Sequence, residues 1–176
     1  MTKLLFGIGE FGSNILEHIL RRKTALILND SHELLLLTNN IPHNDIPYIF
    51  INNHGAIQQS SSQINDYSDL KNEINKYKKI TLFVGIGGSF THEVFHELLA
   101  TNIVDKSKLY IVAVSPFSFE DRETASLAKA TLKTIIDSKI ACSVFANNET
   151  LDDKNDHIQE FMSKFNDKIL GSILEV

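Results

Sequence analysis

The chain has 176 residues, a formal net charge of -5 at neutral pH and 43% hydrophobic residues. This length and composition suffice for one domain with its own core, and the acidic balance argues against nucleic acid or an anionic membrane surface as the main partner. One cysteine cannot form an internal disulfide, which fits a reducing cytoplasm. No apolar run is long enough to span a bilayer, and the N-terminus shows no secretory signal. We therefore expect a cytoplasmic protein with no membrane span and no nucleic-acid partner.

Short apolar runs alternate with amphipathic segments along the chain. Strands are expected over residues 3–8, 25–28, 48–51, 80–84, 109–114 and 141–146. Helices are expected over 13–23, 31–38, 67–77 and 120–137, after residue 88 and over the C-terminal segment, with a surface loop over 52–66. Cys142 falls in the last strand and is expected to be buried there. The alternation predicts an α/β fold with a three-layer, doubly wound, mostly parallel sheet of Rossmann-like type, in a single domain over residues 1–176.

Two units of strand, glycine loop and helix are the most informative parts of this pattern. One has its glycines within residues 7–12, and the other has them within residues 85–88. In such a unit the loop amides and the helix N-terminus attract an anion. Because the carboxyl ends of parallel strands meet at one edge of a sheet, we expect both loops to lie at that edge and to hold one ligand between them.

The first loop reads Gly-x-Gly-x-x-Gly from Gly7 to Gly12, between a strand and a helix. Asp30 follows the second expected strand, about where a ribose-binding acid belongs in a dinucleotide-binding fold. An NAD-type Rossmann enzyme is therefore one interpretation of the first thirty residues. The alternative is a tight strand-to-helix turn that needs glycine and binds no ligand.

The segment from His92 to His96 reads His-Glu-x-x-His. On a helix this spacing puts two imidazoles on one face with Glu93 as the base of a zinc peptidase, provided that a third ligand exists. No third ligand is evident, and Leu99 stands where the longer form of the motif has glycine. The expectation is two partly exposed histidines on a helix flank and no metal site.

Several segments together resemble the bacterial FtsZ/tubulin family. Residues 7–14 resemble its first nucleotide loop, residues 85–91 its glycine-rich signature loop, and residues 54–56 faintly its intermediate phosphate loop. The most specific similarity is Ser-Pro-Phe-Ser-Phe-Glu at residues 115–120, which is similar to the family's Pro-Phe-x-Phe-Glu segment. Residues 136–151 and 166–170 resemble the two segments that read guanine. The order and spacing agree along nearly the whole chain.

The resemblance implies GTP or GDP as the ligand of a nucleotide-binding domain. The implied contacts are Gly9, Glu10, Asn14, Gly87, Gly88 and Ser89 around the phosphates, Glu120 at the ribose, and Asn147 and Asp167 at the guanine edge. A carboxylate suits the last role because it accepts from N1–H and the 2-amino group together.

The chain also departs from the family's pattern. Phe90 and Glu93 stand where the signature loop has glycine and threonine, and Phe11 stands where the first loop has glycine. The chain ends at Val176, before the loop that supplies the family's catalytic acids and before its second domain. We therefore expect a truncated, divergent domain that binds guanine nucleotide with little or no hydrolysis. Its expected protein partner is a copy of itself or an FtsZ-like filament subunit, contacted in part through the apolar stripe of the last helix.

Overall fold

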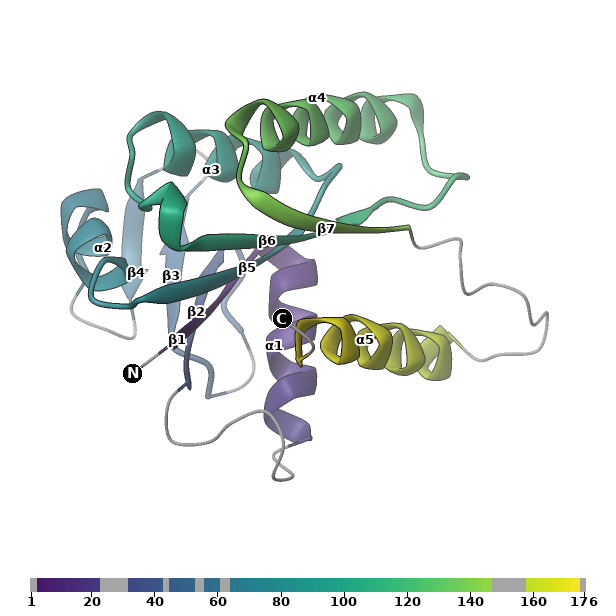
Figure 1. Ribbon diagram of the computed structural model, residues 1–176, viewed down its shortest axis with the longest axis horizontal. Helices are drawn as coiled ribbons and strands as arrows, with labels where there is room; N and C mark the ends of the chain where they lie inside the picture. Colours follow the sequence, from purple (N-terminus) through teal and green to yellow (C-terminus); the bar gives the residue numbers. More distant parts are fainter. Residues whose placement is uncertain are drawn as a thin grey trace.

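The computed structural model describes residues 3–22, 32–42, 45–52, 56–60, 64–146 and 158–174. Seven strands of this part form one sheet in the order β4-β3-β2-β1-β5-β6-β7 (Figure 1). Every neighbouring pair is parallel except β3 and β4, which are antiparallel. The strands are β1 (Lys3–Ile8), β2 (His32–Thr38), β3 (Tyr48–Ile51), β4 (Ile57–Ser60), β5 (Lys79–Gly85), β6 (Leu109–Ser115) and β7 (Ala141–Ala146). This arrangement confirms the expected α/β, doubly wound, mostly parallel sheet.

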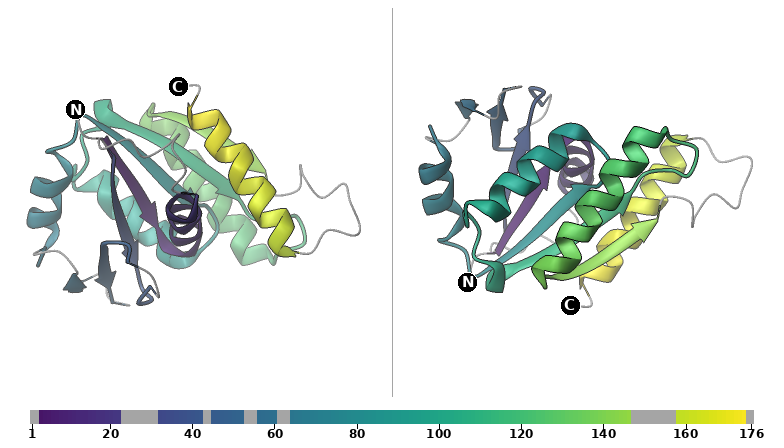
Figure 2. Two further views of the ribbon diagram at one scale, coloured as in Figure 1. Left: turned by 90° about the horizontal axis from the view of Figure 1, so that it is seen from below. Right: turned by 90° about the horizontal axis from the view of Figure 1, so that it is seen from above.

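Helices cover both faces of the sheet. They are α1 (Gly9–Arg21), α2 (Tyr67–Ile74), α3 (Ser89–Ala100), the 3-10 turn η1 (Lys106–Lys108), α4 (Arg122–Ser138) and α5 (Ile158–Leu174). Figures 1 and 2 show α3 and α4 on one side and α1 and α5 on the other. None of the described helices is both long and apolar enough to cross a membrane.

Two hydrophobic clusters, one on each face, hold the three layers together. In β1, Leu4 and Phe6 belong to the cluster under α2, α3 and α4, whereas Leu5 belongs to the cluster that includes residues of α1 and α5. A parallel strand buried on both faces must be apolar at successive positions, which explains why the central strands are continuous apolar runs in the sequence. On the α5 side the buried side chains are Phe165, Ile169 and Leu170.

The expectation of a helix over residues 31–38 was wrong, because residues 32–38 form strand β2. Leucine favours helices in isolation, and Leu34–Leu37 with a preceding Ser31 looks like a capped helix. In the folded chain Leu34 pairs with Leu5 and Leu37 with Ile8, and successive leucines fill opposite faces of the sheet. Tertiary burial therefore overrides local propensity here. The strand expected over residues 25–28 lies outside the described residues.

Two further expectations were wrong at the edges of the sheet. The presumed loop 52–66 contains β4, which pairs with β3 through backbone groups and so needs no apolar pattern. Cys142 is exposed rather than buried, because β7 is an edge strand that is covered less than the strands inside the sheet.

Candidate functional site

The two glycine loops meet at the carboxyl edge of the sheet. β1 and β5 are neighbours with Ile8 beside Val84, so α1 and α3 begin next to each other. Gly9 has a φ of +67°, and a Cβ added there would lie 2.8 Å from Thr91 Oγ1. The expectation that both loops lie at one edge is confirmed. Gly9 is required both by its left-handed backbone and by this close approach.

The glycine pattern at the chain start also serves the packing of α1 against β1. A Cβ on Gly12 would approach the Cα and carbonyl carbon of Gly7 to 2.7 Å, so backbone lies directly against backbone. This contact brings the N-terminus of α1 to the end of the strand without an intervening loop. A helix N-terminus carries unpaired amides and a partial positive charge, which favour an anion there.

A groove of about 320 Å³, which we call the loop groove, opens between these loops and the start of α4. The predicted residues Glu10, Asn14, Gly87, Gly88 and Glu120 line it. Its far wall includes Pro116 and Thr124, and a Cβ on Gly87, whose φ is +131°, would lie 3.0 Å from Thr124 Cγ2. The described lining residues include two carboxylates and no Lys, Arg or His.

The segment between β6 and α4 is shaped by two carboxylates. Glu120 Oε1 accepts from the amide of Phe117 at 2.8 Å, and the Glu120 amide donates back to the Phe117 carbonyl at 3.1 Å. Asp121 caps α4 by accepting from the amide of Thr124 at 2.8 Å, and this bond lowers the pKa of the Asp121 carboxyl. Glu120 is therefore held at the groove by the turn that it closes.

A second groove, the α1–α5 groove, has a volume of about 560 Å³. His18 and Arg22 line it from α1 and its end, and Asn166 lines it from α5. Asn14 and Met162 line both grooves, so the two are adjacent. Together they offer an elongated site with glycine loops at one end and polar side chains at the other.

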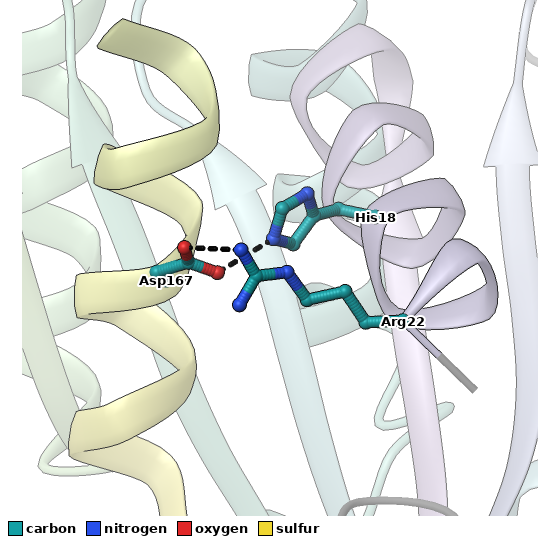
Figure 3. A network of polar contacts seen from close by, with 3 residues as sticks. All are labelled: His18, Arg22 and Asp167. Atoms are coloured by element: carbon teal, nitrogen blue, oxygen red, sulfur yellow. Dashed lines mark hydrogen bonds and ion pairs between the residues drawn. The ribbon is translucent and has the colours of Figure 1, made fainter. Parts of the chain in front are cut away.

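Asp167, predicted to read guanine, is bound to α1 in this structure (Figure 3). Its Oδ1 lies 2.9 Å from His18 Nε2, and its Oδ2 accepts from Arg22 Nη2 at 2.6 Å. His18 follows Gly9 by nine residues, which puts this contact about 14 Å along the helix from the first glycine loop. Asp167 thus contacts His18 and Arg22, which line the α1–α5 groove, but Asp167 is not itself one of the lining residues.

Asn166 lines the α1–α5 groove, although the sequence did not single it out as a site residue. The residue is only 5% exposed, and its Oδ1, which is inaccessible to solvent, has no hydrogen-bond partner among the residues that the structure describes. Buried polar atoms without a partner are rare in native proteins. The Asn166 amide becomes buried only when α5 packs against α1, so no pattern in the sequence identifies this residue.

The remaining predicted positions lie beside the grooves or outside the described residues. Gly9 is buried behind Thr91, and Ser89 is the exposed first residue of α3. Asn147 and Asp30 lie outside the described residues, so neither the guanine contact nor the dinucleotide-type acid is placed.

The histidines of the His-Glu-x-x-His segment face α4. His92 Nδ1 lies 2.7 Å from Thr131 Oγ1, and His96 Nε2 lies 3.2 Å from Thr134 Oγ1. Glu93 instead lines a different groove, beside Tyr67. Within the described part of the chain, no three His, Cys, Asp or Glu side chains are grouped so that they could hold a metal ion.

Comparisons with known proteins bear on the fold. No family model and no curated protein matches the sequence. Among solved structures, CetZ2 from Haloferax volcanii in a GTPγS-bound protofilament is similar with a TM-score of 0.70 at 15% identity, over 99% of this chain and 58% of that one. The empty FtsZ dimer of M. jannaschii has a TM-score of 0.70 at 12% identity, over 98% and 53%. Tail-truncated TubZ of Clostridium botulinum phage c-st has a TM-score of 0.67 at 14% identity, over 97% and 60%.

The resemblance to the FtsZ/tubulin family is thus confirmed at the level of the fold. The chain spans a little over half the length of these solved proteins.

Proposed function

We propose that the chain binds a guanine nucleotide, with the phosphates in the loop groove and the base in the α1–α5 groove. The observation that carries this proposal is the meeting of two glycine loops at the carboxyl edge of the sheet, where open α/β sheets bind ligands. The start of α1 at Gly9 and of α3 at Ser89 supplies two helix N-termini for phosphate.

The size and continuity of the grooves support the same proposal. Volumes of about 320 and 560 Å³ fall in the range of small-molecule sites, and Asn14 and Met162 connect the two. The similar CetZ2 structure is GTPγS-bound, and a similar CetZ1 structure from Haloferax volcanii is a GDP-bound monomer.

We further propose that hydrolysis is slow or absent. Phosphoryl transfer depends on positioning and on positive charge that stabilises the transferring group. The described lining of the loop groove instead offers Glu10 and Glu120, which repel a triphosphate. Phe11 also crowds the loop, because a Cβ on Gly85 would lie 2.9 Å from Phe11 Cβ.

Equilibrium titration of the purified chain tests nucleotide binding. GDP is expected to bind and NAD and zinc are not, and Asn14→Ala is expected to weaken GDP binding by roughly tenfold, as loss of a hydrogen bond to a charged ligand does. The matched control is Asn72→Ala, because Asn72 is exposed on α2 away from both grooves. Binding of NAD but not GDP would replace this proposal with the dinucleotide-enzyme interpretation, and one tightly held zinc would favour the peptidase.

A second proposal, self-association in the cytoplasm, is supported by an exposed aromatic pair at the mouth of the loop groove. Phe119 is 77% exposed and stacks on Phe117, with ring centroids 5.0 Å apart. An aromatic ring left in water beside a ligand groove suits contact with a second copy of this chain. Sedimentation at micromolar concentration is expected to show GDP-dependent assembly that Phe119→Ser abolishes. Assembly unchanged by Phe119→Ser would contradict this, as would a monomer that associates only with an FtsZ-type filament.

A further inference from the structure

The two edges of the sheet differ in how well they are protected against pairing with another strand. β4 is only four residues long, and its register with β3 shifts between Phe50 and Ile51. Short length and irregular pairing are features that blunt an exposed edge. β7 has neither, because its six residues pair with β6 in unbroken register, and it contains no charged residue and no proline. In the part of the chain that the structure describes, β7 therefore ends the sheet as a regular, uncharged edge.

Apolar side chains of β7 are exposed on the side of the sheet that carries α4. Cys142 pairs with Ile111 and Val144 pairs with Ala113, and both β6 residues belong to the cluster under α2, α3 and α4. Paired residues of a parallel sheet share a face, so Cys142 and Val144 face the α4 side. Cys142 is exposed, and Val144 is 45% exposed. α4 therefore leaves this face of β7 partly uncovered.

Ile136 extends this apolar surface onto α4. Thr134 and Ile136 lie about 100° to either side of the buried Ile135, because an α-helix turns once in 3.6 residues. Thr134 faces α3 through its contact with His96, so Ile136 faces away from α3. Figures 1 and 2 show α4 alongside β7, and Ile136 is 62% exposed. We call Ile136, Cys142, Val144 and the outer edge of β7 the β7 patch.

We propose that the β7 patch binds a second copy of this chain, with the two β7 strands paired antiparallel about a twofold axis perpendicular to the sheet. Antiparallel pairing uses backbone groups, and this axis keeps each residue on its own face of the sheet, so Cys142 and Val144 of both copies lie on the same side. The exposed apolar side chains of the two patches are thereby removed from water. Because β7 has no charged residue, the pairing sets no like charges opposite each other.

The charges along α4 favour a second copy in this orientation over another partner. The chain is acidic at the start of this helix and basic toward its end. The exposed charged residues are Glu120, Asp121, Arg122 and Glu123 at the start, and Lys129, Lys133, Asp137 and Lys139 toward the end. α4 leads from the carboxyl end of β6 back to the start of β7, so it runs opposite to β7. The twofold axis therefore turns the acidic start of one α4 toward the basic end of the other, and the two surfaces are complementary in charge.

This interface is separate from the proposed nucleotide site. The β7 patch lies along the lateral edge of the sheet, whereas Phe119 and Phe117 lie at the mouth of the loop groove, at the carboxyl edge. The dimer consequently requires no nucleotide, and the GDP-dependent assembly through Phe119 joins such dimers by a different surface. The inference therefore does not depend on nucleotide binding.

Sedimentation of the purified full chain at micromolar concentration without nucleotide tests the inference. Wild type is expected to be a dimer, and Phe119→Ser is expected to leave that dimer intact. Val144→Lys is expected to weaken dimerisation by roughly tenfold or more, because the two lysines of a dimer would lie close together without an opposite charge. Ile41→Lys is the matched control, because Ile41 is 57% exposed and follows β2, which three strands separate from β7.

Ile136→Lys provides a second test from α4, and it decides if Val144→Lys lowers the melting temperature. It is also expected to weaken the dimer. Amide hydrogen exchange tests the strand pairing itself: amides of β7 that exchange rapidly in diluted wild type are expected to become protected at the higher concentration, but not in Val144→Lys. A nucleotide-free monomer at that concentration would overturn the inference. A dimer that both lysine variants leave unchanged, or one whose β7 amides gain no protection, would overturn it as well.

Discussion

Thr91 Oγ1 occupies the space beside Gly9 in which a side chain would begin, 2.8 Å from the position of a Cβ. Thr91 belongs to the first turn of α3 and is only 7% exposed, so it has little room to move. This close approach is one of the contacts between the two glycine loops, and it requires the absence of a side chain at residue 9.

Gly9→Ala is therefore expected to lower the free energy of unfolding by about 2 kcal/mol, because a positive φ is strained for alanine and the methyl group meets Thr91. In the double variant Gly9→Ala/Thr91→Ala the steric part is relieved and the backbone part remains. Urea unfolding of Gly9→Ala, Thr91→Ala and the double variant measures both contributions. Gly88→Ala is the control, because its φ is -78° and its nearest neighbour would be 3.7 Å away. Equal losses at residues 9 and 88 would contradict the role of Thr91.

The Tyr77 hydroxyl makes the free energy of unfolding depend on pH in the alkaline range. Burial, and then its hydrogen bond to Glu33 Oε2 at 2.6 Å, raises the pKa of the Tyr77 hydroxyl well above its usual value of 10.0. The folded state therefore favours the protonated form. The resulting stability is fully present below pH 10 and is lost as the pH rises above that value, where the unfolded chain releases the proton more readily.

Tyr77→Phe is expected to lower the free energy of unfolding at pH 7 by about 1 kcal/mol, the usual net contribution of one hydrogen bond. It is also expected to flatten the decline in stability between pH 9 and pH 11, which urea unfolding at several pH values measures. An alkaline decline as steep as that of wild type would show that Tyr77 is not its source.

The His96 imidazole lowers the free energy of unfolding toward acidic pH, whereas Tyr77 lowers it toward alkaline pH. Burial, and then the neighbouring ring of His92, lowers the pKa of His96 below its usual 6.5. The folded state favours the neutral form, so the stability from this group is present above pH 6.5 and is lost as the pH falls below it. His96→Gln is expected to lose less stability than wild type between pH 7 and pH 5. Thermal unfolding across this range checks the effect, and equal acid sensitivity of the two proteins would contradict it.

Zinc is not expected to bind at His92 and His96, although the two residues have the spacing of a peptidase motif. Both imidazoles face threonine hydroxyls of α4, and no third ligand accompanies them among the described residues. Elemental analysis is expected to find no stoichiometric zinc, and a chelator is expected to leave the melting temperature unchanged. One zinc ion per chain that is lost in His96→Ala would contradict this prediction.

The sequence predicts the central part of the fold well, because burial on both faces leaves a strong apolar signal. In the middle of the sheet, β1 was predicted with its observed bounds, and β5 and β6 were predicted to within one residue at each end. The strands at residues 48–51 and 141–146, nearer the edges, were also predicted with their observed bounds. Prediction failed where local signals and tertiary context disagree. The leucines of β2 favour a helix until β1 pairs with them, and β4 is polar because backbone pairing alone defines it.

Part of the candidate site could likewise be predicted from the sequence, and part could not. The glycine loops are visible in the sequence because their conformation requires glycine. The partners of Asp167 are not visible, because His18 precedes it by 149 residues and only the packing of α5 on α1 brings them together. Asn166 is invisible for the same reason, since an asparagine on a helix is ordinarily solvated and its burial is a property of the folded chain.

Glu10 allows the charge of the loop groove to be tested directly. Its carboxylate lines the groove in which we propose that phosphates bind, and like charges a few ångströms apart repel. Glu10→Gln is therefore expected to tighten GDP binding by about threefold, the effect of one charge at roughly 6 Å in a solvated setting. The gain should shrink as salt is raised, because exposed charges are screened.

Glu73→Gln on α2, which removes an equal charge far from the groove, is the control. A GDP affinity that does not respond to Glu10→Gln at low salt, or that responds equally to Glu73→Gln, would mean that the phosphates do not lie in this groove.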